Sequence, residues 1–180
     1  MTRHRFDHPS SDEYAPYYDT YVRLMPEGDV LEILESQLRE TLLLLRGLSE
    51  EQAAFSYAEG KWSIKEVIGH IIDTERVFAY RGLCFARGDI TPLPGFEQDD
   101  YVMGAEFNAR SIESLAGEFE HMRHSNIYMF STWSEAVQLR RGTANGNSVT
   151  ARAIPFILAG HERHHLNILR DRYLPLMPVL

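Results

Sequence analysis

The amino-acid sequence predicts an all-α protein: a four-helix bundle with a long crossover loop, an extended N-terminal arm and a small hairpin before the last helix. Four long segments repeat apolar residues at intervals of three and four, which is the period of an amphipathic helix. No region is rich in strand patterns. The length of 180 residues suits one domain, which we divide into an arm, residues 1–28, and a bundle, residues 29–180.

Capping residues mark where the first two helices begin and end. The first begins at Asp29, an N-cap residue, and ends near Gly47. The second begins at Ser63, which has Glu66 in capping-box spacing, and runs without a helix breaker to Gly88. The residues before Asp29 show no helical period and are rich in Tyr, Pro, Ser and Asp. We therefore expect an extended arm that packs through its aromatic side chains.

A long segment, residues 89–110, separates the second helix from the third. It contains two prolines, glycines and several acids, and loops of this length are often lids or pocket walls. The third helix follows over residues 111–133. Asn145-Gly146 then predicts the turn of a small hairpin. The fourth helix is expected to begin near residue 149 or 150 and to continue to about residue 173.

The composition excludes several classes of protein. A formal charge of −8 and a pI near 5.5 argue against nucleic acid as a partner, because such a surface repels polyanions. The single cysteine, Cys84, cannot form an internal disulfide, which fits a reducing compartment. The most apolar segment, "TLLLLRGL", is too short to span a bilayer, so no membrane partner is expected. We expect a cytoplasmic protein.

The fourth helix carries the most informative motif, "HERHH", from His161 to His165. It matches the H-E-x-x-H signature of zinc proteases, in which two histidines one turn apart hold the metal and the glutamate is the general base. Such a protease also needs a third ligand downstream, and the remaining "LNILRDRYLPLMPVL" contains neither Glu nor His. Asp171 lies on the same helix, with no turn to bring it back. We therefore expect no proteolysis and a third ligand from upstream.

His161 and His165 share the apolar face of the fourth helix, because positions four apart nearly superimpose. Two imidazoles on an apolar stripe must each find a hydrogen-bond partner or be desolvated, at a cost of roughly a few kcal/mol. A shared cation removes both costs, so we favour a metal site over two independent core histidines. His164 lies at the edge of the stripe, and we place it in the pocket or around the metal.

The other histidines are less informative. His4 and His8 lie in a segment without clear periodicity, and His121 and His124 point away from the apolar stripe of the third helix, so we expect all four at the surface. His70 is ambiguous. On a helical wheel it groups with acidic residues opposite an isoleucine-rich face, which is typical of a surface histidine. Apolar residues nearly encircle this helix, however, and would let His70 face a neighbour.

Three separated stretches, "KWSIKEVIGHIIDTERVF", "PLPGFEQDDYV" and "GHERHHLNILRDRYL", together resemble the DinB-like superfamily of metal-binding four-helix bundles. The resemblance covers nearly all of residues 29–173, and the stretches occur in the family's order. It implies that His70, His161 and His165 bind one divalent metal ion, for which we expect zinc or nickel. It also implies that Glu162 has no protease role and lies beside the ligands or at the boundary of the site.

Members of this family include bacillithiol S-transferases and mycothiol-dependent maleylpyruvate isomerase. Our preferred interpretation is therefore a metal-dependent transferase that joins a low-molecular-weight thiol to a small electrophile, because a bound cation deprotonates a thiol near neutral pH. One alternative is a metal-dependent hydrolase with metal-bound water and Asp73 or Glu162 as base. Another is a non-catalytic, metal-stabilised binding module. Structural zinc sites usually have four protein ligands, so three candidates favour an open, reactive site.

Two further expectations concern recognition and assembly. Arg81, Arg152 and Arg163 are candidates for holding carboxylates of a thiol, although arginines more often lie on solvated helix faces. The arm contains aromatic residues without an evident burial site, and an aromatic patch is either covered internally or used as an interface, so we expect a homodimer. These residues are Tyr14, Tyr17, Tyr18 and Tyr21.

Overall fold

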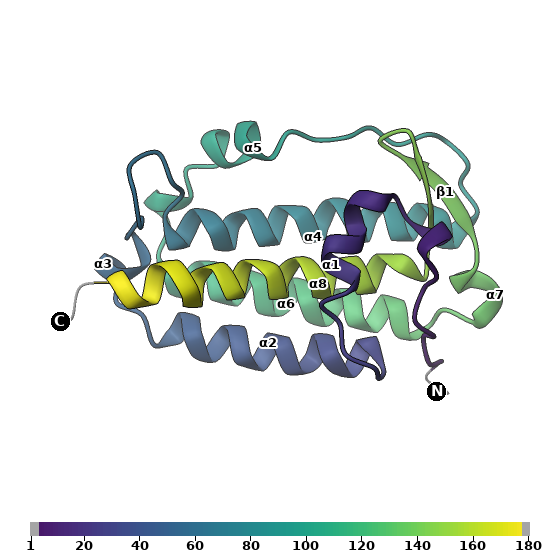
Figure 1. The fold of residues 1–180 in the computed structure, drawn as a ribbon, viewed down its shortest axis with the longest axis horizontal. Coiled ribbons are helices and arrows are strands. Elements are labelled where there is room, and N and C mark those ends of the chain that lie inside the picture. The colour runs from purple at the N-terminus through teal and green to yellow at the C-terminus, as the bar shows by residue number, and fades with distance from the viewer. Residues whose placement is uncertain (1–3, 178–180) are drawn as a thin grey trace.

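The computed structural model describes residues 4–177. Its four long helices, which lie along the long axis of the molecule in Figure 1, are α2 (Val30–Arg46), α4 (Ile64–Arg87), α6 (Ile112–Ser131) and α8 (Ala153–Ile168). A π-helical segment, η4 (Leu169–Tyr173), continues the last of them and is followed by a short 3-10 turn, η5 (Leu174–Leu176). The predicted all-α class and four-helix bundle are confirmed.

The order of the helices around the bundle explains the long crossover. α2 packs on α6 and α8, and α4 packs on the same two helices, so α2 and α4 lie at opposite corners. Figure 1 shows that α2 and α8 run in one direction and that α4 and α6 run in the other. Since α4 and α6 are parallel neighbours, the chain must return along α4, whose 24 residues span about 36 Å.

The returning segment contains α5 (Gln98–Gly104) and η3 (Phe107–Ala109) and runs beside α4 in Figure 1. At its start it is fixed to the hairpin. The Leu93 N–H donates to the Thr143 carbonyl at 2.9 Å, and the Asn145 N–H donates to the Leu93 carbonyl at 3.0 Å. The start of the crossover is therefore held against the hairpin.

The predicted caps are present at the helix ends. Asp29 accepts a hydrogen bond from the Leu31 N–H at 3.0 Å, and Ser63 and Glu66 form a reciprocal capping box at the start of α4. Gly88 ends α4 with a φ of 77°, a left-handed conformation that glycine adopts without steric strain. A short helix, α3 (Glu50–Ala53), lies between α2 and α4.

The predicted hairpin consists of β1 (Arg141–Ala144) and β2 (Asn147–Thr150), which pair antiparallel after a short helix, α7 (Glu135–Gln138). Asn145 and Gly146 have φ values of 48° and 74°, as a two-residue hairpin turn requires. The expected start of the fourth helix at residue 149 or 150 was wrong, because those residues complete β2 and α8 begins only at Ala153.

The N-terminal arm is not extended as expected. It contains three short helical turns, η1 (Ser11–Glu13), η2 (Pro16–Tyr18) and α1 (Asp19–Val22). Each turn has only three or four residues, too few to produce a helical period in the sequence. Figure 1 shows the arm crossing α8. Glu13 fixes the arm to the bundle, where it accepts hydrogen bonds from Thr150 Oγ1 at 2.8 Å and Arg152 Nε at 2.9 Å.

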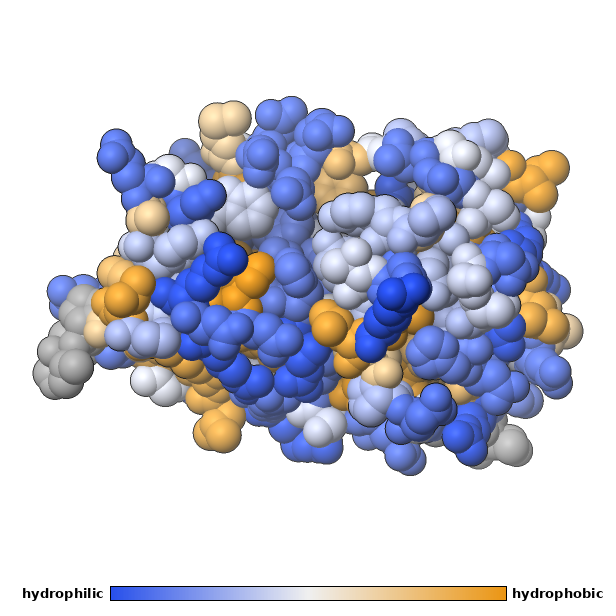
Figure 2. All heavy atoms as spheres, in the orientation of Figure 1, coloured by the Kyte–Doolittle hydropathy of each residue, from blue (hydrophilic) through white to orange (hydrophobic). Residues whose placement is uncertain are grey.

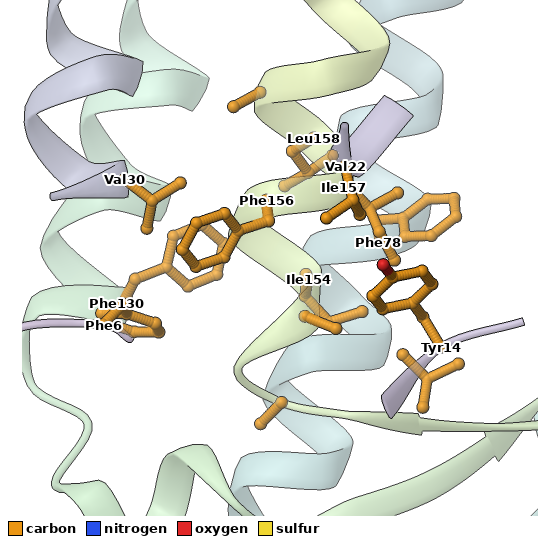
Figure 3. Close-up of a cluster of buried hydrophobic side chains, with 14 of the residues drawn as sticks. Phe6, Tyr14, Val22, Val30, Phe78, Phe130, Ile154, Phe156, Ile157 and Leu158 are labelled. Atoms are coloured by element: carbon orange, nitrogen blue, oxygen red, sulfur yellow. The ribbon is translucent and has the colours of Figure 1, made fainter. Parts of the chain in front are cut away.

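The arm also supplies part of the hydrophobic core. Figure 3 shows Phe6 and Val22 in one buried cluster with Phe130 of α6 and with Phe156 and Ile157 of α8. These side chains are all nearly inaccessible to solvent. A second cluster fills the other end of the bundle. The division of the chain between residues 28 and 29 stays a prediction.

The arm tyrosines find most of their burial within the chain. Tyr14 and Tyr21 are buried and Tyr18 is half-buried, whereas Tyr17 remains 67% exposed. Figure 2 shows that the face carrying the arm is mostly hydrophilic, with hydrophobic residues in separate patches. Among the described residues, no helix has both the length and the apolar composition needed to cross a bilayer.

Candidate metal centre

Three histidines from two helices meet beside the arm. His70 extends from α4, and His161 and His165 extend from neighbouring turns of α8, which packs against α4. The His161 Nε2 atom lies 3.0 Å from His70 Nε2 and 3.1 Å from His165 Nε2. His70 is only 2% exposed, so the surface position that the helical wheel favoured was wrong. The structure thus brings together all three predicted ligands.

Burial keeps these imidazoles in the neutral form that binds metals. Desolvation lowers the pKa of His70 to about 4. Desolvation, aided by the neighbouring His70 and His164, lowers the pKa of His165 to about 3. Desolvation, aided by the neighbouring His165, His70 and His164, holds the pKa of His161 well below its usual range. All three side chains therefore offer lone pairs near neutral pH.

The geometry of the cluster fits a divalent cation. The ligand atoms all lie within 4.8 Å of one another. Imidazole ligands lie about 2.0 to 2.1 Å from zinc, so neighbouring ligand atoms lie about 3.3 to 3.4 Å apart in a tetrahedral site. The two Nε2 separations from His161, 3.0 and 3.1 Å, are slightly shorter than this spacing. Three imidazoles suit zinc, nickel, copper or iron, and three protein ligands leave at least one position open.

Aromatic side chains orient the histidines. Tyr21 of α1 packs edge-on against His161, with ring centroids 5.3 Å apart, and also contacts His164 at 5.5 Å. The ring centroids of Trp62 and His70 lie 5.0 Å apart. His164 is half-buried and lies outside the cluster of ligand atoms, as predicted for a residue beside the site. The arm therefore contributes directly to the surroundings of the centre, which the sequence did not predict.

Glu162 points away from the histidine cluster. Its Oε1 atom accepts a hydrogen bond from Thr41 at 2.6 Å, and its Oε2 atom accepts one from Arg123 at 2.7 Å. Arg123 also binds Glu75 through its Nε and Nη2 atoms, and Asn126 donates to Glu75 at 3.0 Å. This network joins all four long helices and is inaccessible to solvent except at Asn126. Glu162 is therefore a structural residue with both oxygens occupied.

The pKa values of this network follow from burial and charge. Burial raises the pKa of Glu162 against the opposing effect of Arg123. For Arg123, the two carboxylates outweigh desolvation and raise the pKa further above its ordinary value. No sequence pattern indicates this network, because a charged residue within a helical pattern is normally assigned to the solvated face.

Asp73, the other base considered from the sequence, lies beside charged residues of α4 and α6. Its carboxylate lies 3.9 Å from Arg76 and near Glu118, and burial raises its pKa. It does not line the cavity described below. The remaining histidines assigned to the surface, His4, His8, His121 and His124, are exposed as predicted.

A cavity of about 430 Å³ adjoins His70 and His161. Its walls come from five parts of the chain: the arm tyrosines, one face of α4, residues 95–99 of the crossover, the hairpin turn at Asn145, and α8. The expectation that the crossover forms a pocket wall is confirmed. The volume is that of an ordinary small-molecule site.

The three arginines proposed from the sequence differ in their positions. Arg81 is buried and lines the cavity. Arg152 is paired with Glu13 of the arm, and Arg163 is paired with Glu40 at 2.9 Å, both outside the cavity. Only Arg81 is therefore placed to contact a ligand there.

Comparisons with known proteins agree with this geometry. A protein of Oceanobacillus iheyensis with the provisional name metal-dependent hydrolase is 29% identical over 140 residues, which cover 76% of this chain and 77% of that protein. The structure of YfiT from Bacillus subtilis, described as a probable metal-dependent hydrolase with an unusual four-helix bundle topology, is similar with a TM-score of 0.65 at 13% identity. That similarity covers 92% of this chain and 93% of YfiT.

The crystal structure of the mycothiol-dependent maleylpyruvate isomerase is also similar, with a TM-score of 0.65 and 16% identity. The similarity covers 84% of this chain and 66% of the isomerase, so the isomerase has substantial sequence beyond the shared bundle. At these identities, both solved structures establish a shared fold. The sequence profile of the DinB superfamily matches residues 33–169, which include all three clustered histidines, and the chain belongs to that superfamily.

Proposed function

We propose that this chain is a metal-dependent enzyme that transfers a low-molecular-weight thiol to a small electrophile in the cavity beside His70 and His161. One observation carries the proposal: three neutral imidazoles meet beside a ligand-sized cavity, and neither Glu162 nor Asp73 lines that cavity. A divalent ion bound to the three histidines, for which we expect zinc or nickel, would supply the positive charge that favours a thiolate.

The absence of a nearby base favours a thiol over water as the nucleophile at the metal centre. A thiol has an ordinary pKa of about 8.5, so a modest stabilisation of its anion suffices near neutral pH. Hydrolytic enzymes commonly use a general base within hydrogen-bond reach of the attacking water. Among the described residues that line the cavity, the only carboxylates are Glu97 and Asp99, which are exposed on the crossover.

The chain's own groups would hold the centre in the required state. The Nε2 atoms of the three histidines converge, so each ring must carry its proton on Nδ1 in order to present a lone pair to the ion. Tyr21 and Trp62 pack against two of these rings and limit access of water to them. The cavity opens beside His70 and His161, where a ligand would approach.

A metal-dependent hydrolase is the second candidate. The names of the Oceanobacillus relative and of YfiT favour it, whereas the thiol dependence of the isomerase favours the first proposal. In a hydrolase, Glu97 or Asp99 would have to approach the centre through movement of the crossover, because no carboxylate of α4 or α8 lines the cavity.

One assay separates the two candidates. Zinc-loaded protein should transfer N-acetylcysteine to 1-chloro-2,4-dinitrobenzene, and chelation or His161→Ala should abolish this activity. His124→Ala is the matched control, because His124 is exposed on α6. Metal-dependent hydrolysis of 4-nitrophenyl acetate without thiol transfer would establish the second candidate. Failure of both reactions across a panel of cellular thiols and esters would favour a non-catalytic, metal-stabilised binding module.

A further inference from the structure

Arg81 differs in its partners from Arg123, the other buried arginine of the described chain. It is 3% exposed and donates one hydrogen bond, from Nη2 to the Pro94 carbonyl at 2.7 Å. Its guanidinium lies 4.9 Å from the centroid of the Phe78 ring and interacts with the Tyr18 hydroxyl. Within residues 4–177 no carboxylate forms an ion pair with it, whereas Arg123 binds two.

A buried guanidinium without an anion is unfavourable. Taking a charge out of water is compensated only when an opposite charge or a full set of hydrogen bonds is present. A guanidinium has five N–H donors, and the Pro94 carbonyl and the Tyr18 hydroxyl leave several of them free. Since Arg81 lines the cavity, these donors are available to a ligand.

Thr74, on the same face of α4 as Arg81, provides independent evidence for a ligand-binding position. Thr74 is 4% exposed, and its Oγ1 atom has no hydrogen-bond partner within residues 4–177. Thr74 follows His70 by four residues and precedes Arg81 by seven, and these intervals place all three on one face of α4. All three also line the cavity. The unpartnered hydroxyl therefore lies between the histidine cluster and the unpaired cation.

The charge of this region contrasts with the charge of the whole chain. The protein carries a formal charge of −8, yet the inner cavity wall on α4 presents a cation and a neutral hydroxyl. Glu97 and Asp99 are exposed at the outer wall, where solvent weakens their repulsion of an anion. A cation in a partly enclosed cavity acts on a ligand more strongly than a surface cation does.

We propose that Arg81 and Thr74 form a carboxylate-binding subsite, and that either the thiol or the electrophile carries a carboxylate bound there. A carboxylate matches the planar guanidinium with two parallel hydrogen bonds and leaves a lone pair for the threonine hydroxyl. This inference deepens the proposed function by naming the substrate class, and its use in catalysis rests on that function. The binding itself can be tested without catalysis.

Whether the thiol carries the bound carboxylate is tested by titration of two thiols that differ in one carboxylate. N-acetylcysteine and N-acetylcysteamine are titrated into Cys84→Ser protein, with and without zinc, and binding is followed by NMR. The Cys84 substitution removes the chain's own thiol. We expect N-acetylcysteine to bind about tenfold more tightly than N-acetylcysteamine, because hydrogen bonds between ionised groups are the strong ones.

Whether the electrophile carries the bound carboxylate is tested with benzoate and benzamide. Both are titrated in the presence of saturating N-acetylcysteamine. A preference for benzoate assigns the carboxylate to the electrophile, and a preference within the thiol pair assigns it to the thiol. No preference in either pair overturns the subsite. Carboxylate-selective binding without any thiol transfer would leave the subsite in place and reject the proposed transferase.

Variants test whether the preference for a carboxylate depends on Arg81 and Thr74. Arg81→Met should remove the preference for the carboxylate, and Thr74→Val should reduce it several-fold while leaving zinc stoichiometry unchanged. Arg163→Met is the control, because Arg163 pairs with Glu40 outside the cavity. If Arg81→Met does not fold, Arg81→Lys and Thr74→Val still test the proposal. An unchanged preference in folded Arg81 and Thr74 variants would overturn it.

Discussion

The Nε2 atoms of His70 and His161 lie 3.0 Å apart, although 91 positions separate the two residues in the chain. Two antiparallel neighbours, α4 and α8, bring them together, and Tyr21 of the arm packs against His161 from outside. The centre therefore depends on the packing of three parts of the chain rather than on the local H-E-x-x-H motif alone.

Substitution of His70 tests the metal centre directly. We expect zinc-loaded wild-type protein to retain one divalent ion per chain through gel filtration and His70→Ala to lose it, because two imidazoles leave too few ligands. Elemental analysis measures the stoichiometry. Zinc at a free concentration 100 times its Kd should stabilise the wild type by about 2.7 kcal/mol, and the variant far less.

The control for this substitution is His124→Ala, which removes an exposed histidine of α6 and should leave stoichiometry unchanged. Full retention of metal by His70→Ala would contradict the contribution of α4 to the ligand set. Loss of metal from both variants would point instead to unspecific binding by surface histidines.

The stability of the metal-free protein should fall as the pH decreases from about 6.5 to about 4. An unfolded histidine has a pKa near 6.5, whereas burial lowers the pKa of His70 to about 4. Within this window the unfolded chain binds protons that the folded chain excludes, so acid favours unfolding. Each unit of separation between the two pKa values corresponds to about 1.4 kcal/mol.

Urea unfolding of chelated protein at pH 7, 6 and 5 measures this slope. His70→Leu should make the slope shallower, because leucine binds no proton in the unfolded chain. Replacement of the exposed His124 by alanine should leave the slope as it is in the wild type. A slope that is identical in His70→Leu and wild type would show that burial does not control the protonation of His70.

The sequence predicted those features that depend on neighbouring residues. Helix ends followed from caps such as Asp29 and Ser63, and the shared face of His161 and His165 followed from their spacing on one helix. The position of His70 did not follow, because its wheel assignment assumed a helix with one solvated side. α4 is instead covered by the crossover, α6 and α8, and only the family resemblance identified His70 as a ligand.

Other features could not be predicted, because they depend on contacts across the fold. Arg123 reaches carboxylates 48 and 39 positions away, and nothing in its own helix distinguishes it from a solvated arginine. α1 has four residues and therefore no periodic signal. The role of Tyr21 beside His161 consequently became visible only in the structure.

Arg123→Met should destabilise the protein by about 3 to 5 kcal/mol, because it leaves the buried carboxylates of Glu75 and Glu162 without their cation. Denaturant unfolding measures the change. Arg163→Met removes a partly exposed pair with Glu40, so we expect an effect of about 1 kcal/mol or less. Equal effects of the two substitutions would mean that the buried network contributes no more than a surface ion pair.

The predicted homodimer should give a mass near twice the chain mass of 20.7 kDa in light scattering at micromolar concentration. The arm gives less support for it than the sequence suggested, since Tyr14 and Tyr21 are buried within the chain. An interface should therefore lie outside these two residues. A mass equal to one chain would reject the dimer.

The contact between the arm and α8 depends on the absence of a side chain at position 160. A Cβ atom on Gly160 would lie 2.2 Å from the Tyr21 carbonyl oxygen and 2.4 Å from its carbonyl carbon, and both are backbone atoms that move only with the arm. We expect Gly160→Ala to destabilise the protein by about 1 to 3 kcal/mol, the usual range for overpacking. It should also weaken metal binding, because Tyr21 supports His161.

Gly117→Ala is the matched control for this substitution. It lies within α6, and a Cβ atom there would meet no atom of residues 4–177 within 4 Å apart from the nearby backbone of its own helix. Alanine should stabilise that helix by about 0.5 to 1 kcal/mol through its higher helix propensity. Urea unfolding and zinc titration of both variants provide the comparison. A Gly160→Ala protein that is as stable as Gly117→Ala, with unchanged zinc affinity, would show that the arm is not held against α8 through Tyr21.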